Sequence, residues 1–193
     1  LQGHSAKNRL PIFIYKPAPI QVSWLAQGST GIPEIDYFIG SSHITPKNEE
    51  SHYVEKILRL PEISQCFTPP DFDVKVNNLP ALINKFITFG SLNKLTKISD
   101  EAIALWSKIL LSIPNSKLLL KSKEFDNQQI IENTCKRFSK NKISKSRLIF
   151  KGELNTRKEL LEVYNEIDIA LDPFPFQGNT STVEAVWMGV PVI

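Results

Sequence analysis

Cysteine and glycine are both scarce in this chain. Of its 193 residues, 2 are cysteine and 8 are glycine. Cys66 and Cys135 are too few for a disulfide framework and have no CxxC spacing, so they indicate a reducing, cytoplasmic compartment. The glycines form neither a GxGxxG nor a GxxxxGK(S/T) motif, which disfavours dinucleotide binding of the common kind and P-loop chemistry.

The sequence also lacks long apolar runs, clustered metal ligands and a strong charge of one sign. Its longest apolar runs, such as 109–111 and 118–120, are far below the roughly 20 residues that cross a bilayer, which excludes a membrane span. His4, His43 and His52 are scattered, so no metal site is predicted. A net charge of +3 suggests neither nucleic acid nor a membrane surface as partner.

Proline, by contrast, is abundant and unevenly placed. Of 13 prolines, nine precede Lys85: Pro11, Pro17, Pro19, Pro33, Pro46, Pro61, Pro69, Pro70 and Pro80. Such density breaks helices and favours short strands and turns, with one strand predicted over 20–25 and a connecting segment over 71–80. The composition therefore divides the chain into residues 1–84 and 85–193.

From Lys85 onward, strand and helix patterns alternate regularly. Strands are predicted at 86–90, 117–121, 147–151 and 167–171, and helices at 99–113, 130–138, 156–164 and 181–188. This alternation predicts an α/β fold with a parallel, doubly wound sheet. Ligands of such sheets bind beyond the carboxyl ends of the strands, where the loops 91–98, 122–126, 152–156 and 173–180 are expected to converge.

Two of these loops carry residues suited to a diphosphate. Asn93, Lys94 and Lys97 precede one helix, while Gln177–Thr182 brings small polar residues to the N-terminus of another. Lys97 supplies a point charge in this interpretation, and Thr180 and Ser181 donate hydrogen bonds at a helix N-terminus. Glu184 is one turn further along and is suited to ribose hydroxyls.

Simpler interpretations of these loops stay open. Ser181 and Glu184 also match a capping box, and lysines beside a helix start are commonly solvated. The six cations within 136–147 allow a basic interaction domain, although a solvated helix end is favoured because aromatic residues are few there.

Four ordered blocks of sequence carry a family resemblance. They are KPAPIQVSWL (16–25), GIP with IDY (31–37), FGSLNKLTKI (89–98), and DPFPF with GNTST and EAVWMGVP (172–191). In this order they resemble the catalytic region of bacterial O-linked N-acetylglucosamine transferases, the SPINDLY-like glycosyltransferases with tetratricopeptide repeats. The resemblance runs through almost the whole chain.

The resemblance implies a GT-B glycosyltransferase with a Rossmann-like sheet that has helices on both faces and is incomplete at both ends. Residues 1–84 are then the end of the N-terminal lobe with the crossing segment, and 85–193 begin the C-terminal, donor-binding lobe. The implied reaction is an inverting transfer of a sugar, N-acetylglucosamine, from a UDP-sugar to Ser/Thr hydroxyls of a protein, without a metal or other cofactor. A silent sugar-nucleotide-binding module and a transferase of another hexose to a different acceptor stay open as alternatives.

The family's site residues also transfer to this sequence. Lys97 matches the catalytic lysine that contacts the donor diphosphate, and His4 lies in a motif that faces the cleft. The implied UDP-sugar contacts are Asn93, Lys94, Lys97, Arg157, Asn179, Thr180, Ser181, Glu184, Trp24 and Leu25. The sequence departs from the family at three places. The family usually has Asn or Gln at the position of Lys94 and often His at the position of Leu160. It has a Gly and one extra residue at the position of 26–27.

We expect the chain to be a fragment of a longer protein. Leu1 does not begin like a natural N-terminus, and 190–193 resembles the start of a new strand. Tetratricopeptide repeats are expected upstream in the same protein. We expect the 193 residues to be inactive in isolation.

Overall fold

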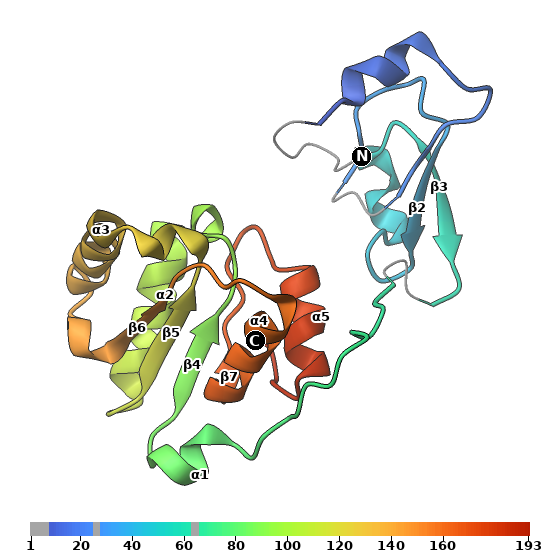
Figure 1. The fold of residues 1–193 in the computed structure, drawn as a ribbon. Helices are drawn as coiled ribbons and strands as arrows, with labels where there is room; N and C mark the ends of the chain where they lie inside the picture. Colours follow the sequence, from blue (N-terminus) through green and yellow to red (C-terminus); the bar gives the residue numbers. More distant parts are fainter. Residues whose placement is uncertain (1–7, 25–27, 63–65) are drawn as a thin grey trace. The chain divides into compact units, whose positions relative to one another are not determined.

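A computed structural model of the protein describes residues 8–24, 28–62 and 66–193. The chain divides after Thr68 into two compact units (Figure 1). Each unit contains its own parallel sheet, and no strand pairs with a strand of the other unit among the described residues.

The segment 69–84 belongs to the second unit, although the proline pattern groups it with the first part of the chain. Phe72 packs against a hydrophobic cluster of the second unit. Further along, the Asn77 N–H donates to the side chain of Asn165 at 2.9 Å. Apolar contact and hydrogen bonding thus place the boundary between the units before the change in composition at Lys85.

Among its described residues, the first unit contains a three-stranded parallel sheet and two 3-10 helices. The strands β1, β2 and β3 lie side by side in chain order and span Val22–Ser23, Tyr37–Ser41 and Lys56–Leu60. The 3-10 helices η1 and η2 span Leu10–Tyr15 and Lys47–His52. The predicted strand 20–25 begins only at Val22, because the Gln21 N–H donates to the Asp36 carboxylate at 2.7 Å instead of to a strand partner, and Leu25 lies outside the described residues.

A buried carboxylate holds the loop between β1 and β2. Glu55 is only 5% exposed and accepts hydrogen bonds from the Thr30 N–H and the Ser29 hydroxyl, each at 2.7 Å. Burial opposes its ionisation, but the hydrogen bonds from Thr30 and Ser29 hold the pKa of Glu55 below its usual value. Two residues of this loop, Ile32 and Ile35, form a small core with Leu10.

The second unit has a four-stranded sheet in which every strand pair is parallel. Its strands are β4 (Thr88–Ser91), β5 (Lys117–Lys121), β6 (Leu148–Lys151) and β7 (Ile169–Ala170). They lie in the order β6-β5-β4-β7, and Val192 extends the sheet by a parallel bridge to Ala170. The prediction of a parallel, doubly wound sheet is confirmed.

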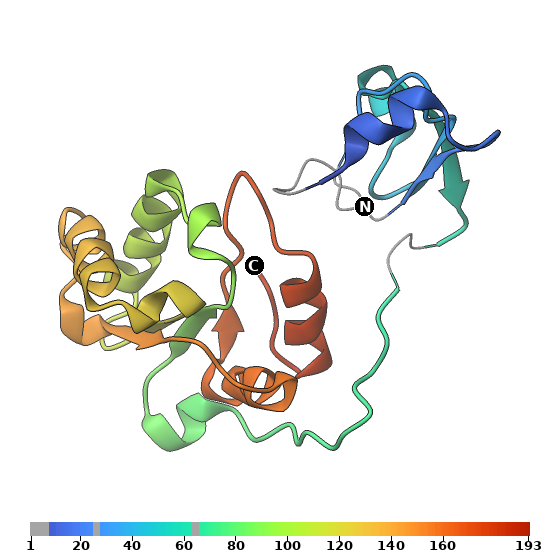
Figure 2. The same ribbon diagram turned by 45° about the horizontal axis from the view of Figure 1, so that its top comes forward.

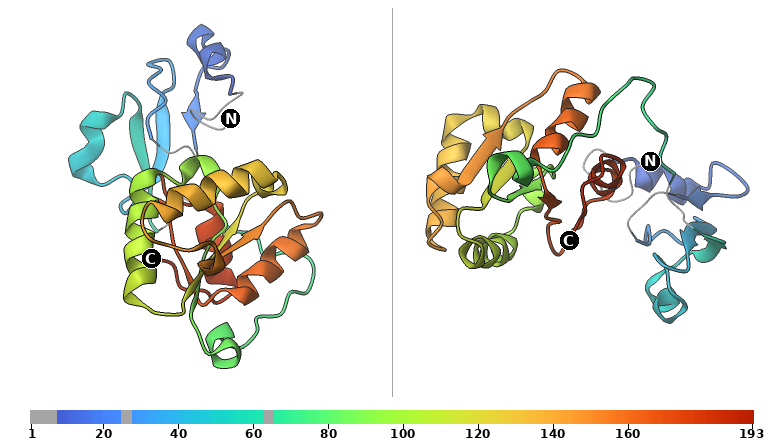
Figure 3. Two further views of the ribbon diagram at one scale, coloured as in Figure 1. Left: turned by 90° about the vertical axis from the view of Figure 1, so that its left-hand side faces the viewer. Right: turned by 90° about the horizontal axis from the view of Figure 1, so that it is seen from below.

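Helices cover both faces of this sheet (Figures 1 and 3). The helices of the second unit are α1 (Pro80–Asn84), α2 (Asp100–Ser112), α3 (Gln128–Ser139), α4 (Arg157–Glu162) and α5 (Thr180–Trp187), of which α2 and α3 pack on one face and α4 and α5 on the other. Short 3-10 helices stand between them: η3 (Leu95–Lys97), η4 (Lys123–Asp126), η5 (Lys145–Arg147) and η6 (Val163–Glu166). Successive residues of β5 point to opposite faces. Leu118 and Leu120 therefore join the cluster of α2 and α3, whereas Leu119 joins that of α4 and α5.

Local signals fix most helix ends in the second unit. The Ser99 hydroxyl accepts from the Ala102 N–H at 3.1 Å and caps α2. The Thr156 hydroxyl caps α4, and the Glu159 carboxylate accepts from the backbone N–H one residue before Thr156. Gly189 follows α5 with a φ of +75°, a conformation that glycine adopts without strain.

Within the described ranges, none of the helices has the length and apolarity that a bilayer span requires. The same part of the chain contains no group of three or more histidine, cysteine, aspartate or glutamate side chains that could hold a metal ion.

Candidate functional site

The strand order places a switch point beside β4. The chain passes from β4 to β5 on one side of it, and returns to β7 on the other side. At such a point the loops after the two strands separate and leave room for a ligand beyond their carboxyl ends. These loops, 92–99 and 171–179, lie side by side in Figure 2.

Side chains and backbone groups connect the two loops directly. The Ser181 hydroxyl donates to Asn93 Oδ1 at 3.1 Å, and Asn93 Nδ2 donates to the Asp172 carboxylate at 3.4 Å. The Ser99 hydroxyl donates to the Phe174 carbonyl at 3.2 Å. Both loops and the start of α5 therefore form one hydrogen-bonded unit at the sheet edge.

Gly178 lies at the centre of this unit. Its N–H donates to the Asp172 carboxylate at 2.7 Å. A Cβ atom at this position would lie 2.6 Å from the hydroxyl oxygens of Ser181 and Thr182, and 2.7 Å from Asp172 Oδ1. Only glycine fits, so the loop backbone can pack directly against Asp172 and the first turn of α5.

Lys97 extends across the gap between the loops. Its Nζ donates to the Gln177 carbonyl at 2.8 Å and lies 4.6 Å from the centre of the Phe176 ring. Partial burial lowers the pKa of Lys97, the negative charge of Asp172 opposes this, and Lys94 adds to the lowering. An ammonium that is partly desolvated and bonded to an exposed loop carbonyl is well placed to exchange that carbonyl for an anion.

The N-terminus of α5 faces the same edge. The helix begins at Thr180 with Asn179 as its N-cap, and no side chain caps it. The predicted capping box of Ser181 and Glu184 is wrong, because Ser181 is already inside the helix and its hydroxyl binds Asn93. The first-turn N–H groups and the helix dipole are consequently available to an anion.

Glu184 lies one turn into α5 and is 7% exposed. Its carboxylate is 3.8 Å from the guanidinium of Arg157, the first residue of α4. Burial raises the pKa of Glu184, and the charges of Arg157 and Lys121 offset part of this rise. The Tyr164 hydroxyl, whose pKa is raised by burial, donates to the Ser181 carbonyl at 2.9 Å and ties α5 to the preceding turn.

The other predicted site residues lie apart or outside the described structure. The Lys94 side chain is exposed beside Lys97. Trp24 belongs to the first unit, where it lines a cavity of about 170 Å³ with Gln21 and Leu10. Leu25 and His4 lie outside the described residues.

Two residues of the site have no role in the sequence-based prediction: Asp172 and Phe176. Asp172 carries the one signal that was available, since a carboxylate directly after a strand's carboxyl end stands at the ligand-binding edge. Phe176 carries no local signal, because its contact at the site is with Lys97, which is far away in the sequence.

The basic stretch 136–147 is only partly free for a partner. Arg137 and Arg147 both donate hydrogen bonds to backbone carbonyls of the unit's own fold. The remaining cations of the stretch, Lys136, Lys140, Lys142 and Lys145, are exposed. This favours a solvated helix end over a nucleic-acid surface.

The strand order, the switch-point lysine and the open helix N-terminus are typical of α/β folds that bind an anionic ligand beyond the carboxyl ends of their strands. Comparison with known proteins gives the family. Glycosyl transferase family 41 matches residues 1–68 and 68–193. The chain belongs to this family.

Individual relatives agree with the family match. The chain is 37% identical over 194 residues to a rice protein, the probable UDP-N-acetylglucosamine--peptide N-acetylglucosaminyltransferase SPINDLY. This match covers 100% of the present chain and 21% of the rice protein. The chain is 28% identical over 203 residues to the SEC protein of the same activity name from Arabidopsis thaliana, covering 100% of this chain and 20% of that protein. The chain thus spans about one fifth of the length of these relatives.

Among solved structures, the fold matches a mutant form of the O-GlcNAc transferase of Thermobaculum terrenum. The TM-score is 0.83 at 36% sequence identity, and the match covers 94% of this chain and 34% of that chain. The two units are accordingly parts of a GT-B glycosyltransferase fold, as the resemblance predicted.

Proposed function

We propose that this chain supplies donor-binding and catalytic groups to a glycosyltransferase that moves N-acetylglucosamine from a UDP-sugar to serine or threonine hydroxyls of proteins. One observation carries the proposal: the Lys97 ammonium and the uncapped N-terminus of α5 stand at the same switch point, held together through Asn93 and Ser181. The family supports this activity, and the names of the relatives specify the donor and the acceptor class.

The diphosphate is assigned to Lys97 and to the first turn of α5, with Thr180 and Ser181 as donors. The bond between the anomeric carbon and the diphosphate oxygen breaks while the acceptor oxygen attacks from the opposite face, which inverts the configuration. Negative charge grows on the departing diphosphate, so Lys97 and the helix N–H groups stabilise the transition state more than the ground state. The acceptor loses its proton to a base that we do not assign.

The nucleoside is assigned to the next turn of α5. The Glu184 carboxylate is assigned as the acceptor for the ribose hydroxyls. The nearby Arg157 guanidinium partly neutralises the negative charge of that carboxylate. Lys94 adds positive charge at the outer rim of the phosphate site. Trp24 and Leu25 are proposed to contact the sugar of the donor, because they match the family's sugar-pocket residues.

The wider setting of the enzyme is proposed from the family. The partners are a UDP-sugar and a protein acceptor, with tetratricopeptide repeats elsewhere in the same protein to present that acceptor. The reaction is proposed to need no metal, so a chelator should leave the rate unchanged. The compartment is proposed to be the cytoplasm, as the two unpaired cysteines suggest.

The decisive experiment compares Lys97→Ala with wild type in the full-length protein. Transfer from radiolabelled UDP-N-acetylglucosamine to acceptor protein should fall by about 10² to 10³ fold, the usual loss when one charge-stabilising group is removed. Lys108→Ala is the matched control, because Lys108 is an exposed lysine on α2 away from the loops. It should keep wild-type activity.

Nucleotide calorimetry separates the alternatives. Binding of UDP without any transfer by wild type would indicate a silent module, and transfer only from other UDP-sugars or from GDP-sugars would correct the donor. Equal transfer by Lys97→Ala and wild type would refute the role of Lys97. Absence of any nucleotide binding would overturn the proposed function altogether.

A further inference from the structure

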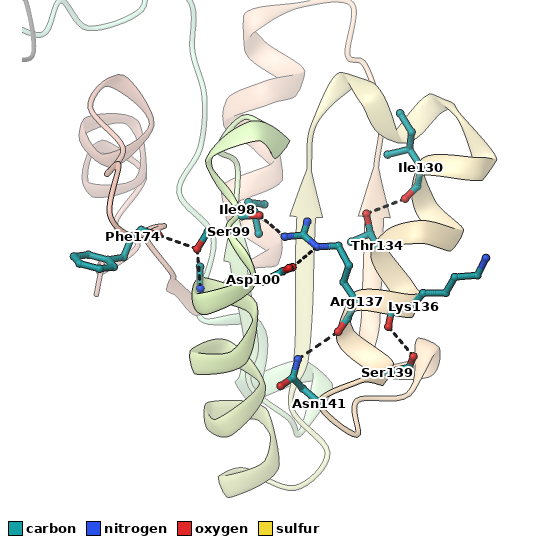
Figure 4. Close-up of polar contacts among 11 residues, drawn as sticks. Ile98, Ser99, Asp100, Ile130, Thr134, Lys136, Arg137, Ser139, Asn141 and Phe174 are labelled. Atoms are coloured by element: carbon teal, nitrogen blue, oxygen red, sulfur yellow. Dashed lines mark hydrogen bonds and ion pairs between the residues drawn. The ribbon is translucent and has the colours of Figure 1, made fainter.

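Arg137, on helix α3, reaches across to the start of α2 with its guanidinium (Figure 4). Its Nη2 donates to the Ile98 carbonyl at 2.7 Å, and its Nε donates to the Asp100 carboxylate at 2.7 Å. Ile98 is the residue directly after Lys97. The guanidinium therefore fixes the backbone at the point where the loop that carries Lys97 enters the helix.

The same short segment is anchored from two other directions. The Ile98 side chain is 3% exposed and packs in the core cluster of α2 and α3. Ser99 caps α2 and binds the Phe174 carbonyl of the second loop, as Figure 4 also shows. Arg137 lies on α3, so its hydrogen bond to Ile98 connects the loop that carries Lys97 to that helix.

The two bonds of Arg137 differ in importance. The Asp100 side chain is 79% exposed, and an ion pair so open to water contributes little. The bond to the Ile98 carbonyl restrains the backbone next to Lys97. A guanidinium makes both bonds at once because its N–H groups form a planar fork, whereas a lysine ammonium cannot reproduce that geometry.

We propose that Arg137 is a positioning residue for donor binding: by holding the Ile98 carbonyl, it sets the position from which the Lys97 ammonium reaches the donor diphosphate. This inference rests on the proposed function of Lys97. It predicts that Arg137 acts on the phosphates of the donor and not on its nucleoside.

The experiment measures UDP and uridine binding by calorimetry and competition, with kcat and KM for the donor, in the full-length protein. Arg137→Ala and Arg137→Lys should both weaken UDP binding by about tenfold, with a drop in kcat, and should leave uridine binding unchanged. Asp100→Asn should change UDP binding less than twofold, because Arg137 still donates to the Ile98 carbonyl in this variant.

Arg147 provides the matched control. It binds the carbonyls of Leu110 and Ile113 at the opposite end of the same helix, at 2.8 and 3.1 Å. Arg147→Lys and Arg137→Lys should both lower the melting temperature, but Arg147→Lys should leave UDP binding and kcat at wild-type values. Equal effects of the two variants on UDP binding would show that Arg137 acts only through stability, and would overturn the inference.

A double-mutant cycle tests the route through Lys97. If Arg137 acts by positioning Lys97, then Arg137→Ala should add nothing to the loss of UDP affinity in Lys97→Ala. Additive losses would overturn the inference while leaving the proposed function intact. A wild-type protein that binds no nucleotide would refute both.

Discussion

Two lysines of the second unit lie over phenylalanine rings at almost the same distance, but at opposite edges of one sheet. Lys97 Nζ is 4.6 Å from the Phe176 ring centre, beyond the carboxyl ends of β4 and β7. Lys117 Nζ is 4.7 Å from the Phe86 ring centre, where β4 and β5 begin. The pairs have the same chemistry, so their surroundings decide what each can do.

At the amino edge, where the strands begin, charged side chains bind backbone groups of the fold. The Asp168 carboxylate, on a residue only 5% exposed, accepts from the N–H groups of Ala81 and Thr88, each at 2.8 Å. Arg147 binds the last carbonyls of α2. At the carboxyl edge, by contrast, Lys97 binds one carbonyl of an exposed loop. Asp168 and Arg147 thus build structure at the amino edge, whereas Lys97 at the carboxyl edge stays exchangeable.

The largest effect on stability is expected from Asp168→Ala. The change leaves the buried N–H of Thr88 and the partly buried N–H of Ala81 without their charged acceptor, and should lower the free energy of unfolding by about 3 kcal/mol. UDP affinity of the folded protein should be unchanged, because the opposite edge keeps its contacts. Denaturant unfolding and calorimetry measure the two quantities.

Glu166→Ala is the control for Asp168→Ala, since it removes an exposed carboxylate that pairs with Lys151 at 2.6 Å. Its effect on the free energy of unfolding should stay within about 0.5 kcal/mol. A loss of UDP affinity in Asp168→Ala would break the separation between the two edges.

An intermediate effect is expected from pH at the carboxyl edge. The pKa of Lys97 is lowered by burial, so its ammonium loses its proton below the usual pKa of 10.5. UDP affinity should therefore fall as pH rises through that lowered pKa, because only the charged form attracts the diphosphate. Calorimetry across alkaline pH should show this fall in wild type and a flat profile in Lys97→Ala. A wild-type profile as flat as that of the variant would contradict the role of Lys97.

The smallest effects are expected from the two aromatic partners. Phe176→Leu should weaken UDP binding by about two- to fivefold, the equivalent of a cation–π contact, without changing stability. Phe86→Leu should lower the free energy of unfolding by about 0.5 to 1 kcal/mol without changing UDP binding. Measuring both quantities on both variants completes the comparison, and an exchange of the two outcomes would refute it.

Where the chain carries local signals, the sequence predicted the fold closely. β5 has the predicted bounds, Lys117–Lys121, and α2 runs from Asp100 to Ser112 within the predicted 99–113, because Ser99 and Pro114 mark its ends. The first unit was harder to predict. Its strands β2 and β3 lack a clear alternation and are stabilised by pairing with each other along their full length.

For the candidate site, the sequence by itself selected the chemistry: a lysine after one strand and small hydroxylated residues at a helix start. Only the tertiary structure decided that Ser181 binds Asn93 instead of capping its helix, and that Lys97 meets Phe176 and Gln177. It also assigned Arg137 to the Lys97 loop. The physical reason is separation along the chain, since capping is a contact between near neighbours, whereas Lys97 and Gln177 are 80 residues apart and meet because parallel strands bring their carboxyl ends to one edge.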